Sequence, residues 1–218
     1  AFVGVIGFVC LVGIWELAGA FARMGITLTV TPLYVGAIGM ITCAWWLGSE
    51  GTLFALYITV FVCAAWRLLD RRQESRMSDV VSSTFTAVYV PFLASFVVLM
   101  LAAWRDPWVF VVFELMVIAN DTGGWAAGVL FGKHPMAPAL SPKKSWEGFA
   151  GSAATAIGVG CVGLWLLGAA WWWGIVAGVS IAFVGTMGDL TESLIKRESG
   201  LKDMSHILPG HGGVLDRV

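Results

Sequence analysis

Residues 107–132 read PWVFVVFELMVIANDTGGWAAGVLFG, a stretch in which Glu114 and Asp121 are the only charged residues. A helix needs about 20 predominantly apolar residues to cross the hydrocarbon core of a bilayer, and this stretch is long enough. The same pattern recurs along the chain, and seven stretches qualify in all. They cover residues 1–22, 32–48, 51–69, 80–103, 107–130, 148–168 and 170–188. The sequence therefore predicts an all-α polytopic membrane protein with about seven transmembrane helices.

The composition points to the same fold class. Hydrophobic residues make up 58% of the 218 residues and charged residues only 12%, whereas a soluble domain has about 45–50% and about 25%. This balance excludes a soluble globular domain, a disordered chain and a disulfide-rich secreted module. The 12 Trp and 27 Gly residues agree, because Trp favours membrane interfaces and Gly is frequent in packed transmembrane helices. The formal net charge of −1 predicts no nucleic-acid partner.

The basic residues lie on one side of the predicted membrane. Of the 13 Lys and Arg residues, all but Arg105 lie in or beside the segments that follow the first, third, fifth and seventh predicted helices. The positive-inside rule assigns these segments to the cytoplasm. The two long polar segments, residues 131–147 and 188–218, lie on the same side. We therefore expect an integral membrane protein whose polar segments face the cytoplasm.

Prolines refine the boundaries and the shape of the predicted helices. Thr31-Pro32 and Asp106-Pro107 each place a capping side chain before a proline at the first helical position, which predicts two helix starts. Pro91 lies inside the fourth predicted helix. Its ring and its missing N–H predict a kink there.

Three acidic side chains lie inside predicted membrane helices. A charged residue at the centre of a bilayer costs about 2.5–3.5 kcal/mol on insertion scales, so it usually faces a helix bundle or a wet cavity. For Asp121 we favour a functional site, because Gly123 and Gly124 beside it allow close approach of the backbone. Glu114 has two open interpretations, a site residue or a hydrogen bond to a neighbouring helix. For Glu16, in the first predicted helix, we favour helix packing.

The first part of the tail, GDLTESLIKRESG at 188–200, predicts a helix that continues the seventh span. On such a helix one face carries two acidic residues, a serine and two basic residues: Asp189, Glu192, Ser193, Lys196 and Arg197. Taken alone, this face is equally well explained by a solvated surface with ion pairs one turn apart. Gly200 is expected to end the helix.

The second part of the tail is a glycine-rich loop between charged residues. The loop consists of Lys202-Asp203, then Gly210, His211, Gly212 and Gly213, and finally Asp216-Arg217. Clustered glycines allow backbone N–H groups to turn toward an anion, and Lys and Arg supply positive charge. Two aspartates brought together by such a loop suit Mg²⁺ shared with phosphates. His211 stays open between a site role and a surface position.

A second polar element, SPKKSWEG at 141–148, follows the fifth span. Lys143 and Lys144 have two interpretations, an orientation anchor at the membrane interface or a phosphate-binding element. No GxSxG, Walker A or GxGxxG motif is present in the sequence. The sequence therefore supports neither covalent serine chemistry nor P-loop chemistry.

The motifs of the second half of the chain together resemble those of a known family. They are NDTG (120–123), GK (132–133), SPKKSWEG (141–148), SLIKR (193–197), KD (202–203) and LPGHGGVLDR (208–217). Their residues and spacing closely resemble the signature of phosphatidate cytidylyltransferases, also called CDP-diacylglycerol synthases. The resemblance covers about residues 110–218, and the first hundred residues are similar only in hydrophobic organisation.

The resemblance implies transfer of a cytidylyl group from CTP to phosphatidate, which gives CDP-diacylglycerol and pyrophosphate. It implies Mg²⁺ as cofactor, with a monovalent cation such as K⁺ as a second ion. It also implies a homodimer in the cell (inner) membrane, among membrane lipids, with a cytoplasmic active site. We expect an N-terminal transmembrane domain of about four spans at 1–103 and a catalytic membrane domain of about three spans at 104–218. Further helices at both ends are usual in the family, so the chain is expected to be truncated.

The resemblance also assigns roles to individual residues, with Asp189, Asp216 and Asp121 binding Mg²⁺. The implied catalytic residues, whose basic members would hold phosphate charge, are Asp189, Lys196, Arg197, Lys202, Asp203, His211, Asp216 and Arg217. The implied substrate-binding residues are Asp121, Lys133, Ser141, Lys143, Lys144, Glu147, Glu192, Ser193, Gly210, Gly212 and Gly213. Two alternatives are an ion-coupled secondary transporter that uses Glu114 and Asp121 and a CTP-dependent lipid kinase. Release of pyrophosphate would separate the synthase from both.

Overall fold

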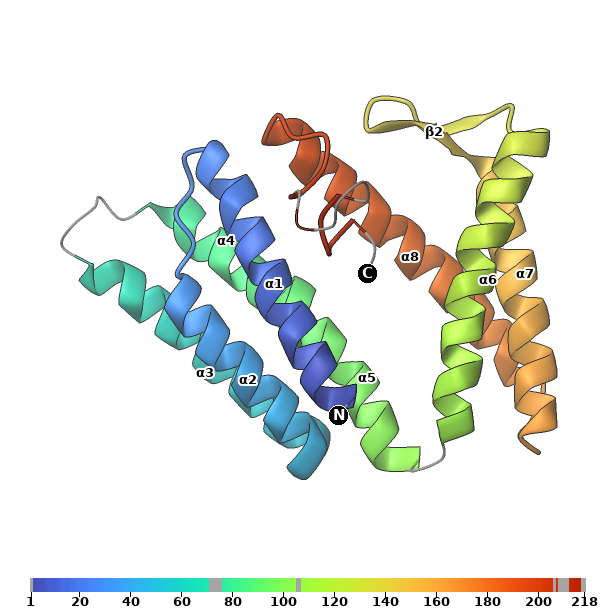
Figure 1. Cartoon of the computed structure of the whole chain (residues 1–218), viewed down its shortest axis with the longest axis horizontal. Coiled ribbons are helices and arrows are strands. Elements are labelled where there is room, and N and C mark those ends of the chain that lie inside the picture. Colours follow the sequence, from blue (N-terminus) through green and yellow to red (C-terminus); the bar gives the residue numbers. More distant parts are fainter. Residues whose placement is uncertain (1, 71–75, 105–106, 206, 208–211, 217–218) are drawn as a thin grey trace. The chain divides into compact units, whose positions relative to one another are not determined.

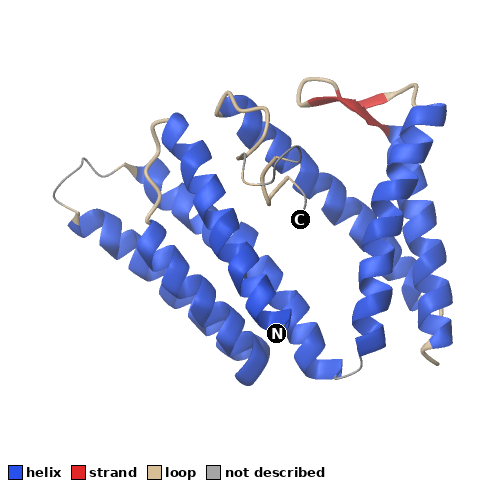
Figure 2. Cartoon of the chain, viewed as in Figure 1, coloured by secondary structure: helices blue, strands red, loops and turns tan. Residues whose placement is uncertain are grey.

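Helices dominate the computed structural model, which describes residues 2–70, 76–104, 107–205, 207 and 212–216 (Figure 1). The helices are α1 (Phe2–Arg23), α2 (Val30–Trp46), α3 (Gly48–Leu69), α4 (Met77–Ala87), η1 (Val88–Phe92), α5 (Leu93–Trp104), α6 (Pro107–Phe131), α7 (Trp146–Leu166) and α8 (Trp173–Glu198). Two short strands, β1 (Pro135–Ala137) and β2 (Ser141–Ser145), pair as an antiparallel hairpin (Figure 2). The all-α prediction is confirmed, and the hairpin is an addition that the sequence patterns did not reveal.

The seven predicted spans correspond to seven helical segments. Six of these are long and apolar enough to cross a membrane, among the residues that the structure describes. One of the six is Met77–Trp104, which joins α4, η1 and α5. The seventh, α2, has 17 residues, which is the lower end of the usual range. The helix α8 continues beyond the membrane-spanning pattern to Glu198, and Gly200 follows with φ at 68°, as expected for a helix end.

The prolines confirm one expected helix start and correct another. The helix α6 begins at Pro107, although Asp106 itself lies outside the described residues. Pro91 lies in the π-helical turn η1, and the kink expected there stays a prediction. The start of α2 at Thr31-Pro32 was wrong, because α2 begins at Val30 with Thr29 at its N-cap. The N–H of Thr29 donates to Ser83 Oγ of α4 at 3.2 Å, and this contact holds the start of the helix two residues before the expected one.

The described chain divides into two compact units. Unit 1 comprises Ala1–Ala103 and Ile195–Val218, and unit 2 comprises Trp104–Leu194. The predicted division after residue 103 separates the same N-terminal helices from α6. Unit 1 joins the tail to the N-terminal helices, and the expected division into an N-terminal and a catalytic domain stays a prediction.

The core of unit 1 lies among the first four spans and the tail. The buried side chains of α1 recur every three or four residues and include Cys10, Ile14 and Leu17, so one face of this helix packs inward. Ile195 and Met204 of the tail belong to the same cluster of buried apolar residues. The tail is therefore part of the hydrophobic core of unit 1.

A buried ion pair ties the polar ends of the unit 1 helices together. The guanidinium of Arg67 lies 2.7 Å from Asp79 Oδ2, and both side chains are at most 4% exposed. Asp79 Oδ1 also accepts from the N–H of Thr27 at 2.9 Å. One carboxylate thus connects α4, α3 and the segment before α2.

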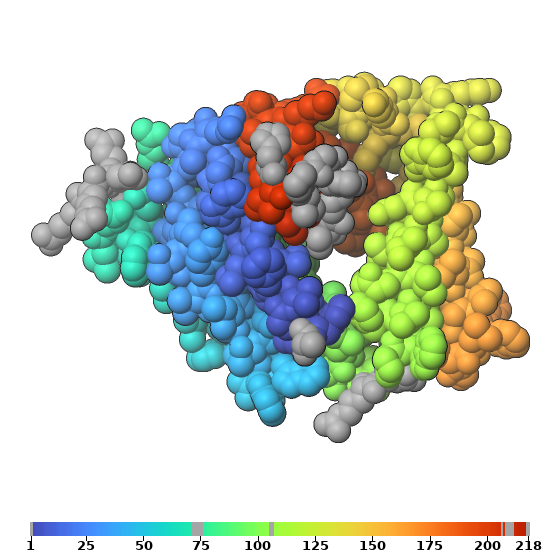
Figure 3. Space-filling model, in the orientation of Figure 1, coloured from blue at the N-terminus to red at the C-terminus, as the bar shows by residue number. Residues whose placement is uncertain are grey.

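In unit 2, small residues allow α6 and α7 to pack closely. A Cβ atom built on Gly123 would lie 2.1 Å from Thr155 Oγ1, and one on Gly151 would lie 2.3 Å from the Cβ of Ala127. Side chains of α6 and α7 are in contact along the face shown in Figure 3. Gly160 and Gly174 similarly allow α7 and α8 to approach. Such contacts between small residues are typical of helices that pack inside a membrane.

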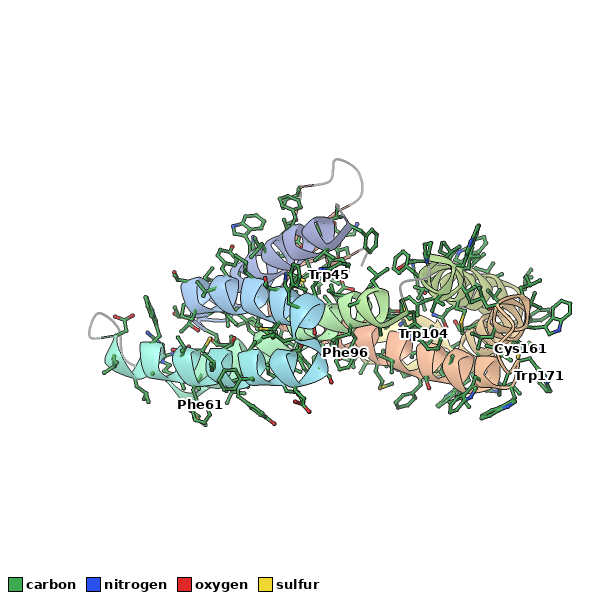
Figure 4. All side chains as sticks on the ribbon, turned by 90° about the horizontal axis from the view of Figure 1, so that it is seen from below. Trp45, Phe61, Phe96, Trp104, Cys161 and Trp171 are labelled. Atoms are coloured by element: carbon green, nitrogen blue, oxygen red, sulfur yellow. The ribbon has the colours of Figure 1, made fainter. Side chains whose placement is uncertain are left out.

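Large apolar side chains cover the outer surfaces of the helices. Phe61 of α3 is 73% exposed, and Trp171, just before α8, is 55% exposed; the side chains of both point outward (Figure 4). In water such a surface would be costly, whereas the hydrocarbon core of a bilayer is as apolar as these side chains. The chain is an integral membrane protein.

Candidate active site

Unit 2 contains a cavity of about 270 Å³ that is lined by several charged and polar residues. It is lined by Asn120, Asp121, Gly124, Trp125 and Gly128 of α6, by Met136, Lys143, Lys144 and Ser145 of the hairpin, by Gly148, Phe149 and Ser152 of α7, and by Thr186 and Asp189 of α8. Four residues that the sequence marked as a site, Asp121, Lys143, Lys144 and Asp189, come together here. We call this cavity the aspartate pocket.

An ion pair joins the hairpin to α8 inside the aspartate pocket. The ammonium of Lys144 donates a hydrogen bond to Asp189 Oδ2. Asp189 is 62% exposed and Lys144 26% exposed. An exposed pair of this kind contributes at most about 1 kcal/mol to stability. Its charges therefore remain accessible to a bound ligand.

A buried amide oxygen lies beside these charges. Asn120 is 7% exposed, its Nδ2 donates to Asp121 Oδ1 at 3.1 Å, and its main-chain carbonyl accepts from Ser152 Oγ at 2.8 Å. Among the described residues, its side-chain oxygen Oδ1 is buried without a hydrogen-bond partner. A buried acceptor without a partner costs about 1–3 kcal/mol. Asn120 therefore adds to the pocket an oxygen that a donor or a cation would satisfy, a role that its place in the NDTG motif did not predict.

Glu147 closes the base of the hairpin. Its Oε1 lies 2.6 Å from His134 Nδ1, and its Oε2 accepts from the N–H of His134 at 3.2 Å. Ser145 caps the adjoining helix α7, because its Oγ accepts from the N–H of Gly148 at 3.1 Å. Both oxygens of Glu147 thus hold the hairpin that carries Lys143 and Lys144, and its implied contact with substrate stays a prediction.

The remaining predicted residues of unit 2 lie outside the lining of the aspartate pocket. Lys133 is exposed at the end of α6, and Ser141 is the first residue of β2. Glu192 and Ser193 are half-buried on α8, one turn beyond Asp189.

Asp216 organises the tail loop of unit 1. Its Oδ1 accepts from Lys196 Nζ at 2.9 Å, and its Oδ2 accepts from the N–H groups of Met204 at 2.9 Å and Gly213 at 2.8 Å. Gly212 beside it has φ at 85°, and a Cβ there would lie 3.0 Å from Asp216 Oδ2. This position therefore favours glycine on both counts.

A second carboxylate, that of Glu16 in α1, holds the same loop. Glu16 Oε1 accepts from Ser205 Oγ and from the N–H of Val214 at 2.7 Å. Its Oε2 accepts from the N–H of Leu215 at 2.8 Å. The interpretation of Glu16 as a helix-packing residue was therefore wrong. The available signal was an acidic residue deep in an apolar span of a chain that also carries a loop rich in backbone donors.

These contacts show which anions the glycine-rich loop holds in the described structure. The N–H groups of Gly213, Val214 and Leu215 donate to the carboxylates of Asp216 and Glu16, and a contact of the loop with substrate phosphate stays a prediction. Gly210, His211 and Arg217 lie outside the described residues. Of the other predicted tail residues, Arg197 and Lys202 are exposed, and Asp203 lies against Gly212.

The aspartates predicted to bind Mg²⁺ are distributed over both units. Asp121 and Asp189 line the aspartate pocket, whereas Asp216 belongs to unit 1, where both of its oxygens already accept hydrogen bonds. Among the described residues, no three His, Cys, Asp or Glu side chains are grouped as a metal site would require. The metal assignment stays a prediction.

Comparison with known proteins identifies the family of the chain. The chain is 39% identical to the phosphatidate cytidylyltransferase of Mycobacterium bovis in an alignment of 230 positions. This alignment covers 99% of this chain and 75% of that protein. It is 35% identical to the phosphatidate cytidylyltransferase of Mycobacterium leprae over 93% of this chain and 70% of that protein. It is 33% identical to the phosphatidate cytidylyltransferase of Pseudomonas aeruginosa over 98% of this chain and 80% of that protein. The family model described as "Cytidylyltransferase family" matches residues 1–218, and the chain belongs to this family.

Proposed function

We propose that the chain is a phosphatidate cytidylyltransferase, which transfers a cytidylyl group from CTP to phosphatidate. The observation that carries this proposal is the family match over residues 1–218, together with relatives of that name aligned over nearly the whole chain. No observation favours the transporter or the lipid kinase. The aspartate pocket supports the same chemistry, because it combines lysines for phosphate charge with carboxylates and an amide oxygen.

The reaction needs positioned charge more than an activated side chain. A phosphate oxygen of phosphatidate attacks the α-phosphorus of CTP, the bond from that phosphorus to the β-phosphate oxygen breaks, and pyrophosphate leaves with the electron pair. The nucleophile is already anionic, so the protein has to align two polyanions and offset their repulsion. Lys143 and Lys144 are the groups of the aspartate pocket suited to this task.

The donor set of the aspartate pocket suits a hard divalent cation. Asp121 and Asp189 offer carboxylate oxygens, and Asn120 offers a buried Oδ1 that lacks a partner among the described residues; oxygen ligands of this kind are those that Mg²⁺ prefers. We infer that Asp121 and Asp189 would hold Mg²⁺, which would neutralise triphosphate charge when bound. Asp216 stays a predicted ligand, and K⁺ stays a prediction with no assigned residue.

We further propose a cytoplasmic active site in the cell (inner) membrane. Twelve of the 13 Lys and Arg residues lie on one predicted side, including Lys143 and Lys144 beside the pocket. At that interface soluble CTP would meet a lipid whose acyl chains stay in the bilayer. The homodimer and the absence of a nucleic-acid partner stay predictions.

Product analysis tests the proposed function. The purified protein is incubated with CTP, Mg²⁺ and either phosphatidate or diacylglycerol, and the lipid and nucleotide products are separated. We expect CDP-diacylglycerol and an equal amount of pyrophosphate when the lipid substrate is phosphatidate, and neither product when it is diacylglycerol. Formation of CDP and phosphatidate from diacylglycerol would instead identify a lipid kinase.

The two lysines of the hairpin are tested separately. Lys143→Gln and Lys144→Gln should each lower turnover without lowering the amount of membrane-inserted protein. Normal turnover of both variants would return the two lysines to the role of an orientation anchor.

A further inference from the structure

The first membrane helix carries a buried carboxylate whose partners all lie in the tail. Glu16 is 1% exposed, and it accepts hydrogen bonds from Ser205, Val214 and Leu215, which are 189, 198 and 199 residues away in sequence. A carboxylate buried in a membrane protein is costly unless donors satisfy it. Here a side chain and two main-chain N–H groups do so.

The fit between α1 and the loop is close on both sides. A Cβ on Gly213 would lie 2.5 Å from Glu16 Oε1, and one on Gly13 would lie 3.1 Å from Leu215 Cδ2. Glycine at Gly213 thus lets the loop backbone reach the carboxylate, and glycine at Gly13, one helical turn before Glu16, makes room for the Leu215 side chain.

Glu16 acts on the residues that the family signature places at the site. Val214 and Leu215 directly precede Asp216, and Asp216 in turn binds Lys196 at 2.9 Å. Holding these two amides fixes the direction in which the backbone delivers the Asp216 side chain. If the loop shifted on α1, the pair of Lys196 and Asp216 would shift with it.

We propose that Glu16 is a positioning residue for cytidylyl transfer, which holds the described part of the tail loop, Ser205 and residues 212–216, from within the first membrane helix. The proposal rests on the proposed function and adds an N-terminal residue to a site otherwise drawn from the second half of the chain. A purely structural carboxylate would support the fold without affecting the loop selectively.

Two variants of Glu16 and one matched control test this role. Glu16→Gln keeps the shape of the side chain but replaces one acceptor oxygen by an NH₂ group, which cannot accept from a backbone N–H. Glu16→Asp keeps the charge but shortens the side chain. The control is Asp79→Asn, which removes an equally buried carboxylate of unit 1 with Arg67 as its partner. For each protein we would measure kcat, KM for both substrates, thermal unfolding and amide hydrogen exchange.

We expect Glu16→Gln to lower kcat about 10- to 100-fold, the range that loss of an orienting partner costs in comparable sites. Exchange should increase at the amides of Val214 and Leu215 before it does elsewhere. The kcat and the loop exchange of Glu16→Asp should lie between those of Glu16→Gln and those of the unmodified protein. Asp79→Asn should unfold at a lower temperature but keep kcat per folded molecule and protection of the loop.

The outcomes separate the two proposals. An unmodified protein that forms no CDP-diacylglycerol would overturn the proposed function. An active protein in which both Glu16 variants keep normal kcat and normal loop exchange would overturn the positioning role. If Glu16→Gln does not fold, Glu16→Asp alone decides between normal and lowered kcat.

Discussion

At the residue scale, two aspartates that the sequence placed in one role have different surroundings. Asp189 is 62% exposed and pairs with Lys144 in the aspartate pocket. Asp216 is 8% exposed and accepts from Lys196 and from two main-chain N–H groups. Replacing a largely exposed carboxylate disturbs little structure, whereas replacing a buried one leaves its donors without a partner. The two residues should therefore respond differently to the same substitution.

We predict that Asp189→Asn lowers the rate of cytidylyl transfer about 10²–10³-fold, the usual cost of one lost electrostatic contact in a transition state. Its free energy of unfolding should change by less than about 1 kcal/mol, because the pair with Lys144 is exposed. Asp216→Asn should lower the rate and also destabilise the tail loop. Rates at graded Mg²⁺ concentrations and thermal unfolding of both variants check this.

Glu198→Gln is the matched control, since it removes an exposed charge from the same helix α8 outside the pocket. It should leave both rate and stability unchanged. A normal rate and an unchanged Mg²⁺ dependence in Asp189→Asn would rule out this residue as a metal ligand.

At the element scale, the pairing of α6 with α7 builds the wall of the aspartate pocket. Asn120, Asp121 and Gly124 of α6 face Gly148 and Ser152 of α7 across it. The two helices approach closely because small residues alternate along the contact, as at Gly123 and Gly151. The hydrophobic pattern marked both spans, but it does not indicate which glycines lie in the contact, because that depends on the rotation of each helix.

We predict that Gly151→Ala destabilises this pair by about 1–3 kcal/mol, the usual cost of an added methyl group in a full contact. Its new Cβ would lie 2.3 Å from the Cβ of Ala127 and 2.7 Å from the main-chain oxygen of Gly123. Gly158→Ala on the same helix has no atom within 4 Å of its new Cβ and should be neutral or slightly stabilising. Thermal unfolding in the same detergent compares the two, and equal effects would show that α6 and α7 do not pack as described.

At the scale of the whole molecule, hydropathy predicted the helices well and the long-range contacts poorly. Each span was recognisable because a bilayer requires a continuous apolar stretch. The contacts of Glu16 with Ser205, Val214 and Leu215 link segments almost the whole chain apart, and no local pattern encodes such a pairing. The motifs NDTG and SPKKSWEG were recognisable as a site, and their shared pocket follows from the packing of α6, α7 and α8. The hydrogen bonds from the loop N–H groups to carboxylates could not be predicted from the sequence, because they depend on the folded backbone.

The shortest membrane helix is the severest test of the predicted topology. With 17 residues, α2 is about 25 Å long at 1.5 Å per residue, against about 30 Å of hydrocarbon. Only Leu47 separates α2 from α3, Gly48 has φ at 71° at this turn, and the two helices pack against each other. Because α3 is long enough to cross, α2 has to return beside it and cross as well.

We therefore predict that Thr27 and Ser49, on either side of α2, face opposite sides of the membrane. Single reporter cysteines, Thr27→Cys and Ser49→Cys, would be introduced after replacement of the four native cysteines. A membrane-impermeant thiol reagent applied to intact cells should label Ser49→Cys, whereas Thr27→Cys should require opened membranes. Ser78→Cys, beyond α3, serves as the internal reference and should behave like Thr27→Cys. Labelling of Thr27→Cys and Ser49→Cys from the same side would show that α2 lies along one face of the membrane, and it would remove the alternation of basic segments that places the active site in the cytoplasm.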